Sequence, residues 1–470
     1  MIPAIALDLG STSIKAGLLD QDGILGGIIS LAAPIIHVDG GHYESDALSY
    51  ALIAEQALSL CLAQTGMAQT GMAQASGSPP LGLCSQRSSF LIWEQATGKP
   101  VTPLISWQDN RGAQSCAALQ AQEPLITELT GLRLTPYFFA TKLRVVLQEN
   151  PRWRERLEHG ELLVGTLDTF LIWRWTGGVH YLTDVSMAAR TLLMDIRKQY
   201  WSPVLCTLFD IPMGILPAIM PSTGLNIPLA NGLTLQASLG DQSAALIASV
   251  GEDRDVALVN LGTGGFVIRY LNEHHGDTHG YLRTLVYQDG TFPARIAIEG
   301  TLNSIAAALA PYPVSDCKIA DLAANDIFCL AEPSGLGAPY FRNDLGLLFS
   351  APVDHLTQTQ IACLLLEAII FRVARIVEDF HRDAALKRVY LSGGLSELSS
   401  LQQGIAQCLS CDVFRLQQRD ASLQGAAMLA ADRKYGSHQD ADKIQISSIN
   451  NYLSDKYQRW KYWLDSLLEI

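Results

Sequence analysis

Residues 4–20 read AIALDLGSTSIKAGLLD, two apolar runs on either side of a turn rich in glycine and hydroxyl residues. The first run carries one acid, Asp8, and the second leads into the turn-forming residues DQDG at 20–23. Short apolar runs bounded by Gly, Ser, Thr and Asp-Gly are typical of paired strands. The stretch therefore predicts an N-terminal β-hairpin.

The turn of this hairpin has the residue types of an anion site. Successive N–H groups in such a turn form a concavity for an anion, and the hydroxyls of Ser11, Thr12 and Ser13 add donors. The ammonium of Lys15 adds a positive charge, and Asp8 is of the residue type that holds Mg²⁺ directly or through water. We interpret the hairpin as a candidate phosphate and magnesium site, with an ordinary N-terminal hairpin as the alternative.

Length and composition limit the class of protein. The chain has 470 residues, 48% apolar and 17% charged, which predicts two or more packed domains. A net charge of −13 argues against a surface for nucleic acid or anionic membrane. No signal peptide and no membrane span are predicted, so we expect a cytoplasmic protein.

Two features of the sequence indicate structure rather than function. Nine cysteines are scattered along the chain, and the closest pair, Cys408 and Cys411, has no second ligand pair near it. This favours reduced, buried thiols over a zinc or redox site. The repeated TGMAQ at 65–69 and 70–74, followed by ASGSPP, predicts a tolerated loop expansion.

Strands and helices alternate along both halves of the chain, which predicts α/β architecture. In the first half, Asp46 opens a helical segment to Gln64, and residues 102–107 read as a strand. In the second half, residues 255–268 repeat the strand, glycine turn and strand of the N-terminus. We therefore expect two related α/β halves, 1–248 and 249–470, that face one nucleotide.

Several motifs, in their shared order, resemble the FGGY carbohydrate kinases of the actin/hexokinase/Hsp70 superfamily, and the glycerol kinases most among them. The motifs are Gln86-Arg87 before Trp107–Arg111, Pro136–Leu143, Gly165–Gly178, Gly240–Ala245, Gly262–Phe266 and Gly335–Tyr340. The resemblance implies an α/β fold of two actin-like (ribonuclease H-like) domains that flank an active-site cleft. It also implies ATP-dependent phosphorylation of a hydroxyl of a small polyol or ketose.

The resemblance also implies roles for particular residues. A sugar hydroxyl is a poor nucleophile, so a carboxylate must accept its proton, and Asp241 matches the family's catalytic base. A helix N-cap is the structural alternative for Asp241. The residues that match the substrate site are Arg87, Ser88, Trp107, Tyr137, Asp241, Gln242 and Phe266.

The cofactors implied are ATP and Mg²⁺. Asp8 would organise the metal, and Ser11, Thr12, Ser13 and Lys15 would line the ATP phosphates from the N-terminal half. From the C-terminal half, the nucleotide would be held by Gly262, Thr263, Gly264, Gly393 and Gly394. The partners expected are a small polyol or sugar and no nucleic acid or membrane, with assembly as a homodimer or homotetramer left open.

The chain departs from the glycerol kinase pattern in two places. Ser88 stands where those enzymes have a glutamate that accepts bonds from two hydroxyls, so the acceptor is glycerol bound more weakly or a longer polyol or ketose. The residues expected to contact adenine fall on Ala306 and Ala310, and Pro311 ends that helix early. Two alternatives stay open: a sugar- or nucleotide-binding pseudo-kinase, and an ATPase that acts on a protein.

Overall fold

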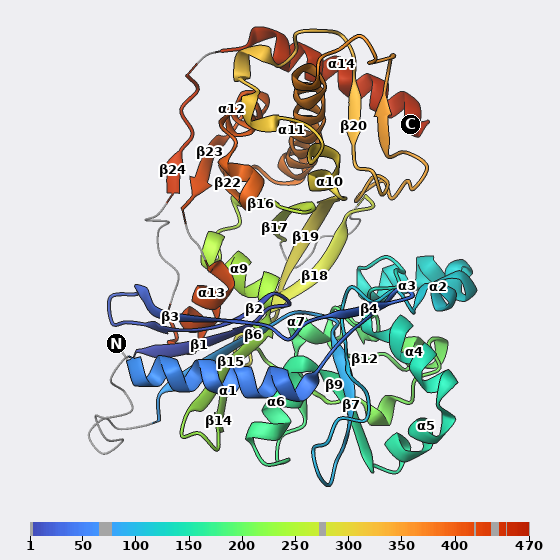
Figure 1. The fold of residues 1–470 in the computed structure, drawn as a ribbon, viewed down its shortest axis with the longest axis vertical. Coiled ribbons are helices and arrows are strands. Elements are labelled where there is room, and N and C mark those ends of the chain that lie inside the picture. The colour runs from blue at the N-terminus through green and yellow to red at the C-terminus, as the bar shows by residue number, and fades with distance from the viewer. Residues whose placement is uncertain are drawn as a thin grey trace. The chain divides into compact units, whose positions relative to one another are not determined.

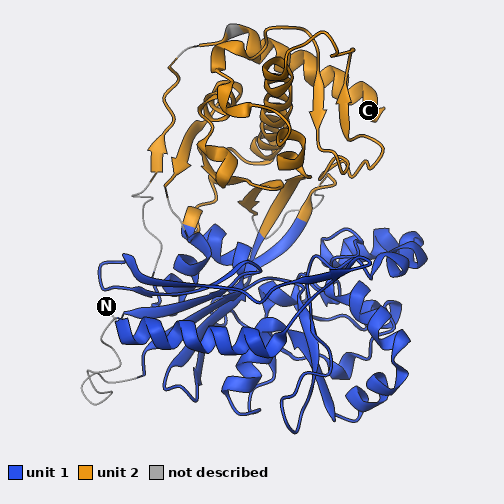
Figure 2. Cartoon of the chain, in the orientation of Figure 1, with its two compact units in different colours: residues 1–248, 283–296, 420–435 blue, residues 249–282, 297–419, 436–470 orange. Residues whose placement is uncertain are grey.

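A computed structural model describes residues 3–64, 78–271, 279–417, 420–433, 441–447 and 449–469 of the chain. These residues form two compact units, which Figure 2 colours separately. Unit 1 comprises Met1–Ala248, Arg283–Ile296 and Asp420–Tyr435, and unit 2 comprises Ser249–Leu282, Ala297–Arg419 and Gly436–Ile470. The continuous domains predicted at 1–248 and 249–470 differ from these units, because two later segments fold with the first part of the chain. Residues 65–77 of the predicted loop expansion lie outside the described residues.

The predicted N-terminal hairpin lies inside the main sheet of unit 1. Ala4–Leu9 (β1) pairs antiparallel with Ser13–Leu19 (β2), and Asp8 lies opposite Lys15 in the register. The sheet has six strands in the order β14-β15-β6-β1-β2-β3 (Figure 1). Its other strands are Leu25–Ala32 (β3), Pro80–Ser85 (β6), Thr223–Pro228 (β14) and Thr234–Gly240 (β15).

A second sheet of unit 1 has five strands in the order β4-β5-β8-β7-β9. They are His37–Asp39 (β4), His42–Ser45 (β5), Phe90–Glu94 (β7), Leu104–Ile105 (β8) and Leu162–Thr166 (β9). The strand predicted at 102–107 is only two residues long, because Pro103 lacks an N–H and a turn closes where Asp109 N donates to Ser106 O. Two short pairs complete the strands: Leu182–Asp184 (β10) with Ala218–Met220 (β13), and Met194–Asp195 (β11) with Tyr200–Trp201 (β12).

Helices cover the sheets of unit 1. They are Ala47–Gln64 (α1), Ala113–Leu119 (α2), Glu123–Thr130 (α3), Phe139–Glu149 (α4), Pro151–Glu158 (α5), Leu167–Trp175 (α6), Val185–Ala188 (α7), Pro203–Leu208 (α8) and Asp241–Val250 (α9), which runs into unit 2. Helix α1 begins where predicted, after Asp46, whose carboxylate accepts from the backbone N–H of Ser49. Among the described helices α1 alone is long and apolar enough to cross a membrane, with a mean hydropathy of 1.2. One face of this helix is nevertheless buried in an apolar core of unit 1, through Ala47, Tyr50, Ala51, Ala54, Ala57, Leu58 and Cys61.

Unit 2 is built around a seven-stranded sheet in the order β18-β19-β17-β16-β22-β23-β24. Its strands are Val256–Leu261 (β16), Gly265–Tyr270 (β17), Leu282–Tyr287 (β18), Arg295–Leu302 (β19), Arg388–Ser392 (β22), Asp412–Leu416 (β23) and Ala441–Lys443 (β24). All of β18 after Leu282 and the first two residues of β19 belong to the segment Arg283–Ile296, which is grouped with unit 1. Cys329–Ala331 (β20) and Leu347–Phe349 (β21) form a separate pair. The helices are Ile305–Leu309 (α10), Gln358–Asp383 (α11), Ser399–Cys408 (α12) and Asn451–Leu468 (α14). Helix α11 is the longest element, and most of its side chains are buried.

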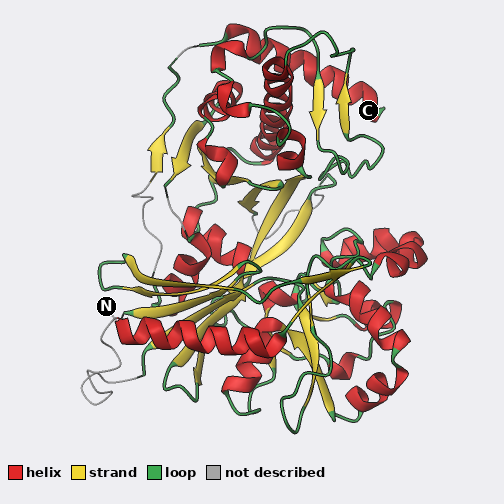
Figure 3. Ribbon diagram, viewed as in Figure 1, coloured by secondary structure: helices red, strands yellow, loops and turns green. Residues whose placement is uncertain are grey.

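The two main sheets share one pattern of pairing. In unit 1, an antiparallel run β3-β2-β1 continues through the parallel strands β6 and β15. In unit 2, an antiparallel run β19-β17-β16 continues through the parallel strands β22 and β23. Figure 3 shows the same mixture of strands and helices in each unit. The prediction of two related α/β halves, each starting with a glycine hairpin, agrees with this topology.

Helix α13, Ala421–Ala430, belongs to unit 1 although it lies near the end of the chain. It packs on β1, β6 and β15. A Cβ atom at Gly82 would lie 2.0 Å from the carbonyl oxygen of Ala426, and one at Gly425 would lie 1.9 Å from that of Ala244. Both positions therefore need glycine, because the backbones of β6, α9 and α13 approach too closely for any side chain.

All nine cysteines lie in the described residues and carry free thiols, buried or half-buried. Cys408 and Cys411 are not joined to each other. Among the described residues, no three His, Cys, Asp or Glu side chains gather in a way that could hold a metal. The free thiols agree with the prediction of reduced, buried cysteines.

Candidate functional site

A cavity of about 310 Å³ opens in unit 1 where three parallel strands end. Ser11 follows β1, Gln86–Ser88 follow β6, and Asp241 follows β15. Residues that follow neighbouring parallel strands meet at one edge of a sheet, and ligands bind there in many α/β proteins. The complete lining is Ser11, Gln86, Arg87, Ser88, Trp107, Thr135, Tyr137, Phe138, Arg190, Asp241 and Gln242.

Six of the seven predicted substrate residues line this one cavity: Arg87, Ser88, Trp107, Tyr137, Asp241 and Gln242. Trp107 and Tyr137 keep 41% and 48% of their surface exposed, as residues at the open side of a cavity do. The seventh, Phe266, is half-buried on β17 of unit 2. The structure thus brings the unit 1 residues together, and their roles stay predictions.

Asp241, the predicted base, is the first residue of α9 and is 32% exposed in the cavity. Its Oδ1 accepts from the backbone N–H of Gln242 at 2.7 Å and lies 3.8 Å from Nε of Arg87. Burial raises the pKa of Asp241, and the guanidinium groups of Arg87 and Arg190 oppose that rise. A raised pKa makes a carboxylate a stronger proton acceptor once it is ionised, which suits a general base.

Arg87 lies across the start of α9. Its guanidinium donates to the side-chain oxygen of Gln242 and faces Asp241, so one cation holds both residues of the Asp-Gln pair. A Cβ atom at Gly240 would lie 2.7 Å from Cδ of Arg87. Glycine at this position therefore leaves the space in which the arginine lies.

Ser88, where the resemblance expects a glutamate, is buried and has a positive φ of 64°. Its hydroxyl donates to the carbonyl oxygen of Arg190 at 2.9 Å, so its proton is directed at the backbone. Arg190 was not among the site residues predicted from the sequence. Its guanidinium lies 5.4 Å from the ring centre of Phe138 and gives the cavity a second cation beside Arg87.

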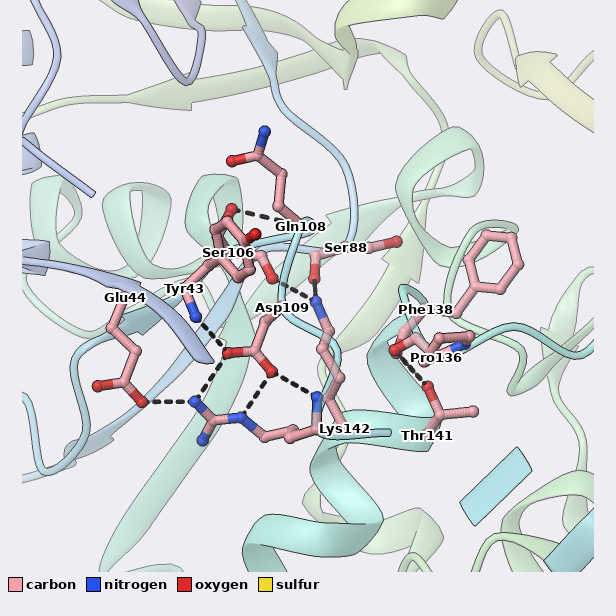
Figure 4. Close-up of polar contacts among 11 residues, drawn as sticks. Tyr43, Glu44, Ser88, Ser106, Gln108, Asp109, Pro136, Phe138, Thr141 and Lys142 are labelled. Atoms are coloured by element: carbon pink, nitrogen blue, oxygen red, sulfur yellow. Dashed lines mark hydrogen bonds and ion pairs between the residues drawn. The ribbon is translucent and has the colours of Figure 1, made fainter. Parts of the chain in front are cut away.

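Behind the cavity lies a buried charged cluster that the sequence analysis did not single out (Figure 4). Lys142, on α4 and fully buried, donates to the carbonyl oxygens of Ser88 at 2.9 Å and Ser106 at 2.6 Å. The buried carboxylate of Asp109 accepts from Arg111 at 2.8 Å, and Arg111 also pairs with Glu44. Burial lowers the pKa of Lys142 to about 7, and Asp109 opposes this. Asp109, Arg111 and Lys142 lie in two of the motifs quoted from the sequence, but the sequence assigned them no role.

The hairpin residues are held by the start of α13, more than 400 residues further along the chain. Ser422 donates to Oδ2 of Asp8 at 2.6 Å, and Asp420 pairs with the ammonium of Lys15 at 2.6 Å. Burial raises the pKa of Asp8 to about 6, with a further contribution from the charge of Asp241. Asp420 and Ser422 were not predicted from the sequence, because nothing local marks them as partners of the N-terminus.

The residues around Asp8 fit a magnesium ion. Oδ1 of Asp8 is buried and accepts no hydrogen bond from the described residues, and Asp241 is close enough to influence its ionisation. Mg²⁺ is usually held by one or two carboxylates together with water and substrate phosphates. The carboxylate of Asp8 can serve as a ligand of such a site. The remaining ligands of Mg²⁺ can be water and phosphate oxygens, so a complete cage of protein ligands is not needed.

In unit 2, the predicted nucleotide glycines lie after two neighbouring parallel strands, β16 and β22. Gly262, Thr263 and Gly264 form the tight turn to β17, closed by a hydrogen bond from Gly262 N to Gly264 O at 2.8 Å. Gly393 has a φ of 87°, and a Cβ atom there would lie 2.4 Å from the carbonyl oxygen of Leu261. Gly394 begins the next helical turn.

The early end of the helix that Pro311 predicts is present in unit 2. Helix α10 runs only from Ile305 to Leu309, so Ala306 lies inside it and Ala310 follows it. Neither alanine has a polar side-chain group that could bind a nucleobase. Any base contact from this segment therefore comes from other residues.

Comparison with known proteins gives matches over almost the whole chain. The family model "FGGY family of carbohydrate kinases, N-terminal domain" matches residues 3–260, and the model of the C-terminal domain matches residues 257–432. The apulose kinase of Pectobacterium atrosepticum is 32% identical over 97% of this chain and 96% of its own. A glycerol kinase of Alkalilimnicola ehrlichii is also 32% identical, over 91% of this chain and 89% of its own.

A solved structure supports the fold. The crystal structure of Plasmodium falciparum glycerol kinase with ADP matches with a TM-score of 0.87 and covers 99% of this chain and 98% of its own. Its sequence identity is 22%, so the likeness concerns the fold.

Proposed function

Because this chain belongs to the FGGY family of carbohydrate kinases, and is therefore an ATP-dependent sugar or polyol kinase, we propose that it phosphorylates a small ketose in preference to glycerol. The family and the two-domain α/β fold predicted from the sequence are confirmed. The single observation that carries the proposed reaction is the meeting of Asp241, Arg87 and Gln242 at one cavity.

Asp241 acts in this proposal as the general base. It accepts the proton of the acceptor hydroxyl as the oxygen bonds to the γ-phosphorus of ATP, while the bond to the ADP oxygen breaks. Arg87 and the N-terminus of α9 hold the carboxylate in place, and Gln242 offers its amide hydrogens to the sugar. Trp107 and Tyr137 supply apolar faces for the carbon skeleton.

The phosphate side of the reaction rests on the hairpin and on the glycine turns of unit 2. The backbone and hydroxyls of Ser11 to Ser13 would donate to the ATP phosphates, and Lys15 would add charge after exchanging Asp420 for a phosphate oxygen. Asp8 would hold Mg²⁺, which neutralises charge on the transferred group when it is bound. In unit 2, Thr263 and its flanking glycines would contribute further donors.

The preference for a ketose follows from the hydrogen-bonding groups of the cavity. Arg87, Arg190 and the indole of Trp107 only donate, and the Ser88 hydroxyl donates to the backbone. Asp241 is the one carboxylate of the lining and is needed by the reacting hydroxyl. The carbonyl oxygen of a ketose, which only accepts, suits these donors, and the lining hydroxyls of Ser11, Thr135 and Tyr137 can accept from the hydroxyls of the sugar. The relative named an apulose kinase supports the same direction, because the ending -ulose denotes a ketose.

The test is a coupled ADP assay with purified protein and Mg-ATP over glycerol, tetritols, pentuloses, heptuloses and gluconate. We expect the highest kcat/KM with a pentulose and lower values with glycerol. Asp241→Asn is the matched control, since it keeps the shape of the side chain and removes the base. Full turnover in Asp241→Asn would refute the role of Asp241, and a kcat/KM that is highest for glycerol would refute the ketose preference.

A non-catalytic binding protein is the second candidate, favoured by the shortened α10 with Ala306 and Ala310. Calorimetry separates the two functions: sugar or nucleotide binding without ADP production from any acceptor supports the second.

A cytoplasmic location fits the proposal, because nine free thiols are typical of a reducing compartment.

A further inference from the structure

A continuous chain of buried hydrogen bonds runs through unit 1 from the turn of the hairpin to one wall of the cavity. Tyr50 on α1 donates from its hydroxyl to the carbonyl oxygen of Gly10 at 3.2 Å. Gln86 donates from its side-chain amide to the same tyrosine oxygen at 3.0 Å. Ser89 donates to the amide oxygen of Gln86 at 2.9 Å, and the backbone N–H of Trp107 donates to the Ser89 hydroxyl at 2.9 Å.

Every bond in this chain runs in one direction. Each hydroxyl accepts from the residue on one side and donates to the residue on the other, so the order of donors runs from Trp107 to Gly10. Turning over the Gln86 amide would set its NH₂ against the Ser89 hydroxyl and its oxygen against the tyrosine, and both hydroxyls would then lose a partner. Tyr50, Gln86 and Ser89 are 1%, 4% and 0% exposed, so water cannot replace a lost bond.

Both ends of the chain reach the same cavity. Ser11, the residue after Gly10, lines the cavity at the hairpin end of this chain of hydrogen bonds. Trp107 lines the cavity at the other end of the chain. Gln86 itself also lines the cavity, beside Arg87. The side chains of Tyr50, Gln86 and Ser89 thus link the phosphate turn to the sugar wall by direct hydrogen bonds, in addition to the backbone bond from Gln86 N to Leu9 O.

We propose that Gln86, together with Tyr50 and Ser89, is a positioning relay that fixes the Gly10 turn and the backbone of Trp107 relative to each other. None of the three transfers a proton to substrate. Their contribution is to hold two parts of the site, one for phosphate and one for the acceptor, at the spacing that the reaction needs. The catalytic part of this inference rests on the proposed function, and the structural part does not.

The test uses Tyr50→Phe, which removes one oxygen and so breaks two bonds of the relay. Its matched control is Tyr181→Phe in the same unit, which removes a buried hydroxyl that donates to the carbonyl oxygens of Val164 and Ile215, each at 2.6 Å. Amide hydrogen exchange of the full-length protein, without any ligand, is followed in the peptides that contain Trp107 and residues 10–13. We expect exchange at Trp107 to rise about five- to tenfold in Tyr50→Phe and to stay at the wild-type rate in Tyr181→Phe.

The kinetic arm measures KM and kcat for Mg-ATP and for the best acceptor of the ADP assay. The relay predicts a rise in both KM values in Tyr50→Phe, of about the same factor as the exchange rate, and unchanged KM values in Tyr181→Phe. If Tyr50→Phe fails to fold, Gln86→Glu replaces it: a carboxylate accepts from both neighbours, turns the Tyr50 hydroxyl away from Gly10 and gives the same expectation.

The outcomes separate the two proposals. Equal exchange at Trp107 in both tyrosine variants overturns the relay, whatever the enzyme phosphorylates. Faster exchange with unchanged KM values also overturns its role in positioning substrates. If the wild type transfers phosphate to no acceptor, the proposed function fails, and the exchange measurement still decides whether the relay couples the two ends.

Discussion

Replacing Lys142 with methionine tests the buried cluster behind the cavity. The side chain has zero exposure and donates to two carbonyl oxygens, those of Ser88 and Ser106, that flank Arg87 and Trp107. Methionine has a similar length and no hydrogen-bond donor. In Lys142→Met both carbonyl oxygens therefore lose their hydrogen-bond donor, and the methionine occupies the space of the lysine side chain.

The expected loss of unfolding free energy in Lys142→Met has one contribution that is constant and one that depends on pH. Each buried carbonyl left without a donor costs roughly 1–3 kcal/mol of unfolding free energy. Burial lowers the pKa of Lys142 from 10.5 to about 7. Between these two pH values the unfolded chain binds one proton more than the folded chain, so the stability of the wild type rises with pH by about 1.4 kcal/mol per unit. Below pH 7 both states are protonated, and this contribution is constant.

The assay is urea unfolding at pH 7, 8 and 9 for the wild type and Lys142→Met. Since methionine does not titrate, the stability difference between the two proteins should widen by about 1.4 kcal/mol per pH unit. Leu143→Ala is the matched control, because Leu143 is the next residue on α4, is fully buried and carries no titratable group. The loss of unfolding free energy in Leu143→Ala, roughly 2–5 kcal/mol, should be the same at each pH. A constant difference for Lys142→Met as well would refute the reasoning.

Three further predictions concern specificity, pH dependence and stability. Ser88→Glu should raise kcat/KM for glycerol relative to the best ketose by about ten- to a hundredfold, since a carboxylate accepts from two hydroxyls; an unchanged ratio in the ADP assay would contradict this. Because burial raises the pKa of Asp241, kcat/KM should fall on the acidic side at a higher pH than an ordinary aspartate would give, whereas a rate that stays flat down to about pH 4 would speak against Asp241 as the base. Glu332→Ala in unit 2 leaves the buried guanidinium of Arg372, now 2.7 Å from that carboxylate, without its counter-charge. This should cost about 3–5 kcal/mol in urea unfolding, and a loss below about 1 kcal/mol would contradict it.

Much of the fold and of the acceptor site could be predicted from the sequence. The hairpin at 4–19 and the helix after Asp46 follow from local patterns of apolar, turn and capping residues, which act within a few residues of each other. The meeting of Arg87 and Asp241 was also predictable, through the resemblance and through their places after strands that turned out to be parallel neighbours. Such motifs can be recognised in the sequence because each is short and contiguous.

The partners of those motifs were decided by the tertiary structure alone. Lys15 pairs with Asp420, and Asp8 accepts from Ser422, because glycines at 82 and 425 let a late helix pack against the N-terminal sheet. Nothing near position 420 marks it as part of the first unit. A hydrogen bond or an ion pair depends on an approach within about 3 Å, and for residues 400 positions apart that approach is set by the packing of the whole unit. The local sequence therefore determined the functional groups of the hairpin, whereas the tertiary structure alone determined the ion pair and the hydrogen bond that those groups form.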